Sequence, residues 1–372
     1  MIQIQISYEI QSRRNTMSRL EQIKKEMAKE GIDAIYITSA ENHRYACLFN
    51  NPDGQVLITK NESYVFADFR YIEAAKRECD KGFNVIMPTT PEREYLPECC
   101  AKNGVKVLGF EEGNMTFEHY KKLSDALDGV EMVPAAKVMN ALRITKTEDE
   151  VEKIAAAQRI AEAALVELLG RIKYDMTEKE VAAELEYLMK RGGAENISFE
   201  TIAVSGSNSS SPHGVPRNCK LERGFLTLDF GATIDGYHSD MTRTVCIGKA
   251  DEDMKKMYYT VLKAQTSVID VIKEGSSNFE MDKIARDIIN GAGYEGCFGH
   301  SLGHGVGLLI HELPNLSPKS PSDLVLHAGE IVTVEPGIYV EGKYGCRIED
   351  MVYITPGSSV DLTLAPKELI EL

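Results

Sequence analysis

The second half of the chain contains the same succession of elements twice, and this repetition restricts the folds it can adopt. A capping box at Thr147 opens a long amphipathic helix that runs to about Arg171, and a second helix covers about 177–192. A similar pair of helices is expected at 252–273 and 279–290. Because each pair precedes strand and loop segments, we expect two related halves within one α+β domain, although their sequences share little identity.

The first half of the chain alternates helices with short apolar strands. A capping box that begins at Ser18 opens a helix, and Gly31 ends it. Strands are expected at DAIYIT, QVLIT, SYVFA, FNVIM and VKVLGF, and helices near 70–80, 91–103 and 116–128. This alternation predicts an α/β domain, a mixed sheet flanked by helices. The stretch does not cluster histidine with carboxylates at ligand spacing, so we interpret it as a structural or assembly domain.

The pattern changes between 134 and 147, which marks the expected domain boundary. A chain of 372 residues is too long for one small core, and two domains are the usual solution. We therefore expect an N-terminal domain over 17–140 and a C-terminal domain over 141–372. Residues 1–16 are expected to be a disordered extension, or to reflect a start codon placed too early.

Composition argues against several classes of protein. The net charge of −15 disfavours nucleic acid and anionic membranes as partners, because both attract a basic surface. No apolar run approaches the roughly 20 residues of a membrane span, and the N-terminus lacks the apolar segment of a signal peptide. The eight cysteines are scattered without a CxxC pair, as in proteins kept reduced. We therefore expect a cytoplasmic protein.

Five acidic or imidazole residues of the second half stand in unusual local settings, most of them where a strand pattern meets glycine or turn residues, and Glu349 within a strand of alternating character. They are Asp229 in LDFG, Asp240 in HSD, His304 in SLGHGVG, Glu335 in VEPG and Glu349 in RIED. Each residue alone is better explained as an ordinary turn, loop or surface residue. Together, the four carboxylates would balance the charge of two divalent cations. Two such cations repel each other, and carboxylates that bridge them reduce this repulsion.

Two of these carboxylates belong to the stretch LDFGATIDGYHSDMTRT, which reads as a β-hairpin. Asp235-Gly236 is a typical two-residue hairpin turn. The turn would bring Asp229 and Asp240 across from each other on its two arms. We therefore expect both carboxylates within coordination distance of one shared metal position.

The ordered motifs LDFGA…SDMTRT, SLGHGVGLLIHELP, VEPGIY and RIEDMV resemble the pita-bread metallopeptidases. This family includes Xaa-Pro aminopeptidases, Xaa-Pro dipeptidases (prolidases) and methionine aminopeptidases. The resemblance is strong over 147–360, and 17–140 is similar to the smaller N-terminal domain of the proline-specific branch. It implies a curved antiparallel sheet with helix pairs related by a pseudo-twofold axis. It also implies metal ligation by the five residues above, with Asp240 and Glu349 bridging two metals.

The resemblance adds four residues around the metals. His213 in SPHGVP and His311 in LIHELP resemble histidines that hydrogen-bond the substrate and the tetrahedral intermediate, so both are expected to act in catalysis and substrate binding. His300 resembles a residue on the substrate side. Arg347, two residues before Glu349, is expected to border the substrate and to support that carboxylate through a charged hydrogen bond.

The implied reaction is hydrolysis of the Xaa-Pro bond at the N-terminus of short peptides. A hydroxide bridging the metals would attack the carbonyl, because metal binding lowers the pKa of water towards about 7. One metal and His213 or His311 would stabilise the oxyanion, and Glu335 would carry the proton to the leaving nitrogen. The ligand set favours manganese, with cobalt, zinc and iron as alternatives.

Several alternatives stay open at this point. The N-terminal domain favours the proline-specific branch over methionine aminopeptidases, which generally lack it, but a methionine aminopeptidase-like exopeptidase is retained. No motif separates aminopeptidase from dipeptidase. Metal-free creatinase-like hydrolases and non-catalytic binding modules share the fold, and the complete ligand set counts against both. The resemblance also implies a homodimer or higher homo-oligomer.

Overall fold

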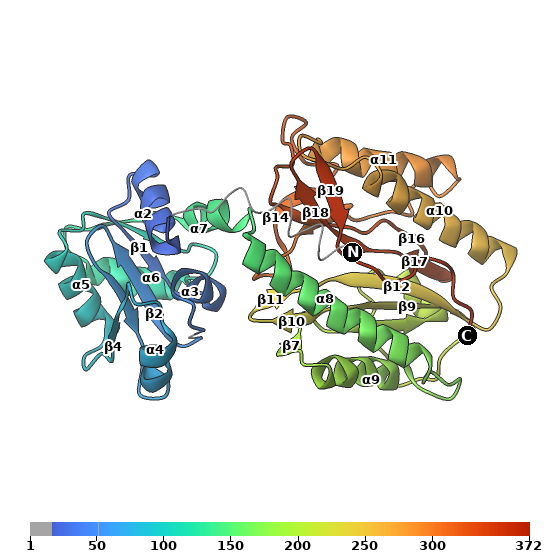
Figure 1. The fold of residues 1–372 in the computed structure, drawn as a ribbon, viewed down its shortest axis with the longest axis horizontal. Helices are drawn as coiled ribbons and strands as arrows, with labels where there is room; N and C mark the ends of the chain where they lie inside the picture. The colour runs from blue at the N-terminus through green and yellow to red at the C-terminus, as the bar shows by residue number, and fades with distance from the viewer. Residues whose placement is uncertain (1–16, 51) are drawn as a thin grey trace. The chain divides into compact units, whose positions relative to one another are not determined.

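The computed structural model describes residues 17–50 and 52–372, so the expected extension at 1–16 lies outside the described residues. The chain separates into two compact units between Arg143 and Ile144 (Figure 1). Within the described ranges, none of the helices has the length and apolar character needed to cross a membrane.

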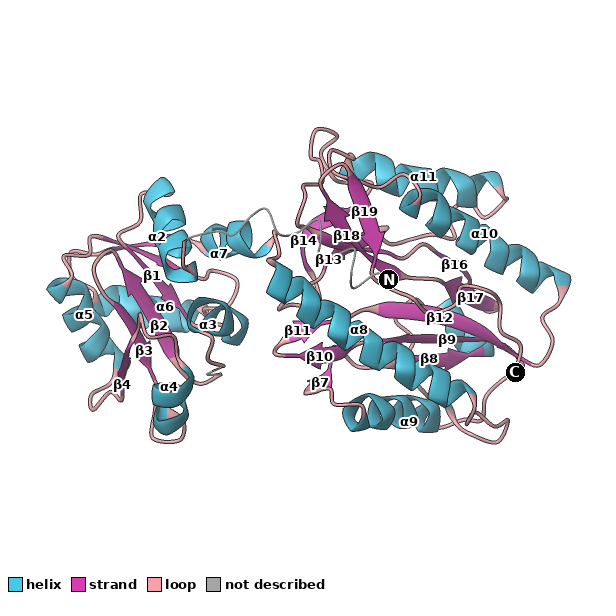
Figure 2. Ribbon diagram, viewed as in Figure 1, coloured by secondary structure: helices cyan, strands magenta, loops and turns pink. Residues whose placement is uncertain are grey.

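The first unit is built on a six-stranded mixed sheet with strand order β4-β3-β2-β1-β5-β6. The strands are β1 (Ala34–Ile37), β2 (Gln55–Thr59), β3 (Ser63–Phe66), β4 (Asn84–Ile86), β5 (Val107–Phe110) and β6 (Glu131–Pro134). The helices are α2 (Arg19–Lys29), α3 (Ala40–Cys47), α4 (Ile72–Glu78), α5 (Glu92–Lys102), α6 (Phe117–Ala126) and α7 (Ala136–Arg143). Helices pack around the sheet (Figure 2), which confirms the expected α/β architecture.

The sequence did not predict α3, a short helix that buries the polar side chains of Asn42 and His43 together with Tyr45, Ala46 and Cys47. Glu111, directly after β5, receives hydrogen bonds from the backbone N–H groups of Thr38 at 2.5 Å and Ser39 at 2.8 Å. The same carboxylate accepts a bond of 2.5 Å from Asn42 Nδ2. His43 is also fully buried, and its Nε2 lies 2.9 Å from the Ile37 carbonyl oxygen. Tertiary hydrogen bonds therefore hold α3 where periodicity gave no signal.

The second unit consists of antiparallel ladders and two helix pairs. Its helices are α8 (Glu148–Leu169), α9 (Glu178–Arg191), α10 (Glu252–Ile269) and α11 (Asn278–Gly291), with a short 3-10 helix η1 (Gly206–Ser210). The first strands are β7 (Asn196–Ile197), β8 (Ile202–Ser205), β9 (Gly224–Phe230), β10 (Ala232–Ile234), β11 (Tyr237–His238) and β12 (Met241–Ile247). The remaining strands are β13 (Gly303–Gly305), β14 (Glu312–Leu316), β15 (Ile331–Val334), β16 (Gly337–Val340), β17 (Tyr344–Arg347), β18 (Asp350–Thr355) and β19 (Ser358–Asp361).

Each helix pair of the second unit buries its own set of strands. The pair α8 and α9 shares one apolar core with β8, β9 and β12, in which Leu165 and Leu228 are buried. The pair α10 and α11 shares a second core with β15 and β18, in which Val261 and Val332 are fully buried. The sheet orders are β11-β10-β7, β12-β9-β8, β14-β13-β15-β18-β19 and β16-β17. Two helix pairs, each with its own strands, match the expected duplicated arrangement (Figure 2).

Local signals placed these helices well. The capping boxes at Thr147 and Thr177 are both formed, with Glu150 and Glu180 bonded back to the cap residues. Reciprocal hydrogen bonds of this kind satisfy backbone donors that a helix leaves free at its start. The helices of the second unit therefore begin where the sequence predicted them.

Helices α5 and α6 of the first unit are linked by an ion pair between Glu92 and His119. His119 Nε2 lies 2.9 Å from Glu92 Oε2, and the Tyr36 hydroxyl donates to the same carboxylate. Burial opposes ionisation of Glu92, but the hydrogen bonds from His119 and Tyr36 outweigh burial and lower its pKa. The hydrogen bond to Glu92 raises the pKa of His119 above the usual 6.5, against the opposing effect of burial.

We predict that His119→Gln reduces stability mainly at mildly acidic pH. Because folding raises the pKa of His119, the protonated imidazole stabilises the fold at pH below the pKa of His119 in the unfolded chain. This stabilisation is lost as pH rises through the pKa of His119 in the folded chain. Because folding lowers the pKa of Glu92, the ionised carboxylate stabilises the fold at pH above the pKa of Glu92 in the unfolded chain. This stabilisation is lost as pH falls through the pKa of Glu92 in the folded chain. Thermal unfolding should show a loss on the order of 1 kcal/mol near pH 5.5 and a smaller one near pH 8.

The matched control is Glu118→Gln on the same helix, because this exposed carboxylate is ionised at both pH values. The small effect of this substitution on the free energy of unfolding should be the same at both pH values. Equal losses at both pH values for His119→Gln would contradict the predicted role of the ion pair.

Candidate metal centre

One cavity of about 620 Å³ in the second unit contains every residue that the sequence assigned to the site. Its lining includes Asp229, Asp240, His304, Glu335, Glu349, His213, His300, His311 and Arg347. Three of them lie on β9, β13 and β17, and one directly follows β15. The others lie in the loop after η1 and in the loops before β12, β13, β14 and β18. The fold therefore gathers at one place residues that lie far apart in the sequence.

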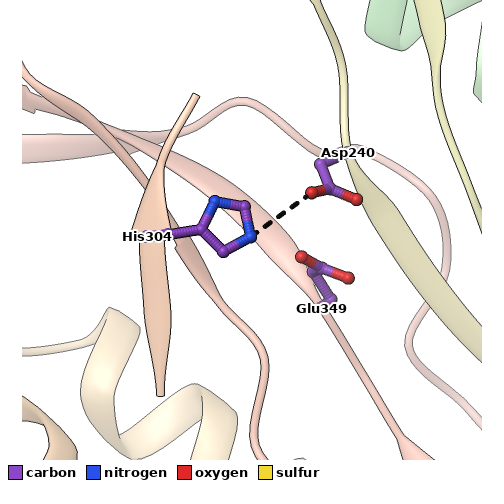
Figure 3. Close-up of side chains that lie close together, drawn as sticks. All are labelled: Asp240, His304 and Glu349. Carbon is purple, nitrogen blue, oxygen red and sulfur yellow. Dashed lines mark ion pairs between the residues drawn. The ribbon is translucent and has the colours of Figure 1, made fainter. Parts of the chain in front are cut away.

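Three of the five predicted ligands form the tightest group. Asp240, His304 and Glu349 each offer an atom, and these atoms all lie within 4.8 Å of one another. Figure 3 shows the three side chains pointing towards one another, with His304 Nε2 3.6 Å from Asp240 Oδ2. One imidazole and two carboxylates at this spacing are a typical donor set for a divalent cation.

The glycines around His304 are required by close packing of β13 between its neighbours. A Cβ atom at Gly303 would lie 1.9 Å from the Thr333 carbonyl oxygen, and one at Gly305 would lie 2.2 Å from the Leu313 carbonyl oxygen. Side chains at these positions would clash with backbone, so only glycine fits. The motif GHG thus places the imidazole of His304 at a position where neighbouring strands approach very closely.

Glu335 and Asp229 border this group. Glu335 Oε1 lies 3.3 Å from His304 Nε2 and accepts a hydrogen bond of 3.2 Å from Thr333 Oγ1. Asp229 Oδ2 accepts a bond of 2.6 Å from Arg347 Nη2, whereas its buried Oδ1 has no hydrogen-bond partner among the described residues. A buried carboxylate oxygen without a donor is unfavourable unless a cation completes it, so the site fits a metal.

The electrostatics of the cavity also favour a cation. Burial and the nearby Asp229 carboxylate raise the pKa of Asp240 well above its usual value, and burial and Asp240 do the same for Glu349. Burial also opposes ionisation of Glu335, but the hydrogen bond to His304 lowers its pKa to about 2. The carboxylates thus repel one another, and divalent cations between them would remove this repulsion.

Arg347 supports the carboxylates in a way that differs from the expectation. The sequence suggested a charged hydrogen bond to Glu349, but the guanidinium donates to Asp229, and its Nε donates to Thr242 Oγ1 at 3.0 Å. Thr242 in turn donates to Glu349 Oε2 at 2.6 Å. The Arg347 side chain also donates to the Tyr339 hydroxyl at 2.6 Å.

Thr242, Thr333 and Tyr339 are thus contacts of the site that the sequence reasoning missed. Thr242 had a usable signal, because it lies two residues after Asp240, and alternate residues of a strand share one face. In the ladder it lies directly opposite Asp229. Thr333 had a similar signal, because it lies two residues before Glu335 and donates to it. Tyr339 carried no comparable signal, because the pairing of β16 with β17 brings it to Arg347.

The structure confirms the predicted hairpin turn. Ile234 pairs with Tyr237, and Asp235 and Gly236 both have positive φ, +48° and +76°, as this two-residue turn requires. Asp240 joins the three-residue group, and Asp229 lies beside that group in the same cavity. A metal position shared by Asp229 and Asp240 stays a prediction.

The three predicted histidines outside the ligand set lie in the same cavity. The rings of His311 and His304 are 4.3 Å apart between centroids, a convergence that their spacing in the sequence could not show. His300 Nε2 lies 3.0 Å from the Tyr339 hydroxyl oxygen, and its Nδ1 lies 2.8 Å from the Ser301 carbonyl oxygen. His213 lies in the segment that follows η1.

We predict that Asp240→Asn weakens metal binding at least about tenfold, because the variant loses a charged ligand. In the unaltered chain, Mn²⁺ at about 100 times its dissociation constant should add about 2.7 kcal/mol of stability. Unfolding with and without Mn²⁺, together with calorimetric titration, measures both effects. The exposed turn variant Asp235→Asn should keep the full response, and a full response in Asp240→Asn would contradict the ligand assignment.

Comparison with known proteins assigns both units. Residues 152–356 match metallopeptidase family M24, and residues 19–145 match the creatinase/prolidase N-terminal domain. The Xaa-Pro dipeptidase of Pyrococcus furiosus is 36% identical over 357 residues, which cover 95% of this chain and 99% of that protein.

Solved structures agree with this assignment. An Xaa-Pro dipeptidase from Bacillus anthracis superposes with a TM-score of 0.92 at 39% identity, covering 96% of this chain and 100% of that one. An X-Pro aminopeptidase from Thermotoga maritima superposes with a TM-score of 0.87 at 35% identity, covering 94% of this chain and 100% of that one. These likenesses confirm the expected pita-bread architecture of the C-terminal domain. The chain belongs to metallopeptidase family M24.

Proposed function

We propose that this chain is a metal-dependent exopeptidase that hydrolyses the bond between an N-terminal residue and a following proline. The observation that carries the proposal is the gathering of the five predicted ligands, three histidines and one arginine around a single cavity. Relatives of nearly equal length that are named Xaa-Pro dipeptidase or X-Pro aminopeptidase support the substrate class.

The five ligands Asp229, Asp240, His304, Glu335 and Glu349 would hold two divalent cations. The unpartnered oxygen of Asp229 and the mutual repulsion of the carboxylates support this assignment. An oxygen-rich donor set with one imidazole suits Mn²⁺, and Co²⁺, Zn²⁺ or Fe²⁺ are alternatives. When bound, the cations supply a water of lowered pKa and polarise the peptide carbonyl.

The side chains of the cavity would carry the remaining chemistry. Glu335 is oriented by His304 and Thr333, and from this position it would receive a proton and pass it to the leaving nitrogen. His213 and His311 would donate hydrogen bonds to the carbonyl oxygen as charge develops on it. His300 and Arg347 would border the bound peptide from the side of Tyr339.

The size of the cavity agrees with a short peptide. About 620 Å³ lies within the range of sites that enclose small ligands. A proline in second position has no N–H and a fixed φ, so a dedicated site is needed for this bond. A cytoplasmic location and assembly into a homodimer or larger homo-oligomer stay predictions of the sequence.

An assay of three peptides with added Mn²⁺ tests the proposal. We expect hydrolysis of Ala-Pro or Ala-Pro-Ala and none of Met-Ala-Ser, because the site is proposed to require proline in second position. Activity on Ala-Pro alone would assign a dipeptidase, and activity on Ala-Pro-Ala an aminopeptidase. Cleavage of Met-Ala-Ser alone would move the chain to the methionine branch. No metal-dependent cleavage of any peptide would favour a binding module.

We predict that Glu335→Gln lowers kcat by about 10²- to 10⁴-fold, because the amide cannot accept and return the proton. An amide oxygen can still ligate metal, so metal content should fall far less than activity. Steady-state kinetics and metal analysis of the same preparation give both values. Glu341→Gln, at an exposed turn, is the control and should leave both unchanged. Undiminished turnover in Glu335→Gln would remove this residue from proton transfer.

A further inference from the structure

His213 is held in the cavity by a segment without regular structure. The described residues 211–223, between η1 and β9, contain neither a helix nor a named strand. A side chain on such a segment keeps its position only if other groups fix the backbone on both sides. The contacts of the neighbouring residues therefore decide where the imidazole of His213 lies.

On the N-terminal side, the catalytic cavity itself anchors this segment. Arg347 Nη1 donates a hydrogen bond of 3.2 Å to the carbonyl oxygen of Pro212. The backbone N–H of Gly214 donates to the Ser211 carbonyl oxygen at 3.0 Å, which closes a turn around His213. The residue before His213 is thus tied to the arginine that also binds Asp229.

On the C-terminal side, a single buried carboxylate anchors the segment. The side chain of Glu178 is 0% exposed. Its Oε2 accepts bonds from the backbone N–H of Arg217 at 2.9 Å, from Arg217 Nε at 3.0 Å and from Asn208 Nδ2 at 2.9 Å. Its Oε1 accepts from Arg217 Nη2 at 2.9 Å and from the backbone N–H of Ser205 at 2.8 Å. Asn208 Nδ2 also donates to the Val215 carbonyl oxygen at 3.1 Å.

Helix capping does not explain this carboxylate. Glu178 is the first residue of α9, but the capping box of that helix is made by Thr177 and Glu180. Glu178 is instead directed to η1 and to the segment that carries His213. The backbone N–H groups of Glu178 and Lys179 donate to the Cys219 and Arg217 carbonyl oxygens, so the segment also lies against the first turn of α9.

We propose that Glu178 is a positioning residue for His213. Its carboxylate joins Ser205, Asn208 and Arg217, and through Asn208 it fixes the chain two residues after His213. The proposal rests on the proposed function, because it assumes that His213 acts on the substrate. Displacement of a catalytic hydrogen-bond donor by about 1 Å is enough to reduce turnover strongly.

Glu178→Gln tests the proposal, because glutamine keeps the shape but replaces one acceptor oxygen by an NH₂ group that faces the donors of Arg217 or Ser205. We expect kcat on the Xaa-Pro peptide to fall about tenfold with KM and metal affinity nearly unchanged. In a His213→Ala background, the same change should lower kcat less than about twofold, because residues that act through one another are not additive.

Glu180→Gln is the matched control, because it alters the capping box of the same helix without touching the segment of His213. Glutamine can still close the capping box, so the variant loses only a negative charge at the helix N-terminus; it should lower the unfolding temperature slightly and leave kcat unchanged. If Glu178→Gln does not fold, Asn208→Ala replaces it in the same cycle, since Asn208 links Glu178 to Val215 while the carboxylate keeps its bonds from Arg217 and Ser205. We then expect kcat to fall about threefold in the otherwise unaltered chain and to stay unchanged when the same substitution is made in the His213→Ala background.

Four results would overturn the proposal. A loss of kcat that is equal in both backgrounds would mean that Glu178 does not act through His213, and a change in stability alone would make it purely structural. If wild-type protein cleaves the peptides but His213→Ala is fully active, the role of His213 is wrong and the inference fails with it. If wild-type protein cleaves none of them, the proposed function itself fails, and the inference that rests on it is overturned.

Discussion

The buried guanidinium of Arg347 connects the parts of the cavity that lie on different strands. It donates to Asp229 on β9, to Thr242 on β12, to Tyr339 on β16 and to the carbonyl oxygen of Pro212. Arginine suits this position because it cannot lose its proton and presents several donors in a fixed plane. A lysine could not reach these acceptors at once. Loss of the guanidinium would leave the buried Asp229 carboxylate without its cation, which is strongly destabilising.

Much of the fold follows from local signals. Capping boxes at Thr147 and Thr177 and the Asp235-Gly236 turn gave helix starts and a hairpin that the structure contains, because each depends on neighbours in sequence. The helix α3 carried no such signal, since Asn42 is bonded to Glu111, which directly follows β5 and is 69 residues away in sequence. Long-range hydrogen bonds are decided by the packed fold, and no periodicity in the sequence records them.

The candidate site shows the same division. The five predicted ligands stood out because four carboxylates and one histidine occur in ordered motifs, three of them close to glycine, and all five line one cavity. The partner of Arg347 could not be read in the same way. Thr242 lies opposite Asp229 in the ladder, and Arg347 donates hydrogen bonds to both residues. Thr242 in turn donates a hydrogen bond to Glu349. Residue types therefore indicated the chemistry, whereas strand register determined which carboxylate the arginine supports.

The charge of Arg347 also bears on the number of cations. Four carboxylates (Asp229, Asp240, Glu335 and Glu349) and one guanidinium give −4 + 1 = −3. One divalent cation would leave −1, and a negative cavity would oppose the oxyanion that forms when a peptide carbonyl is attacked. Two divalent cations would leave +1, which stabilises that oxyanion. Without the arginine, two cations would bring the net charge of the site to zero. With the arginine, two cations would make it positive, and this supports a pair of cations over a single one.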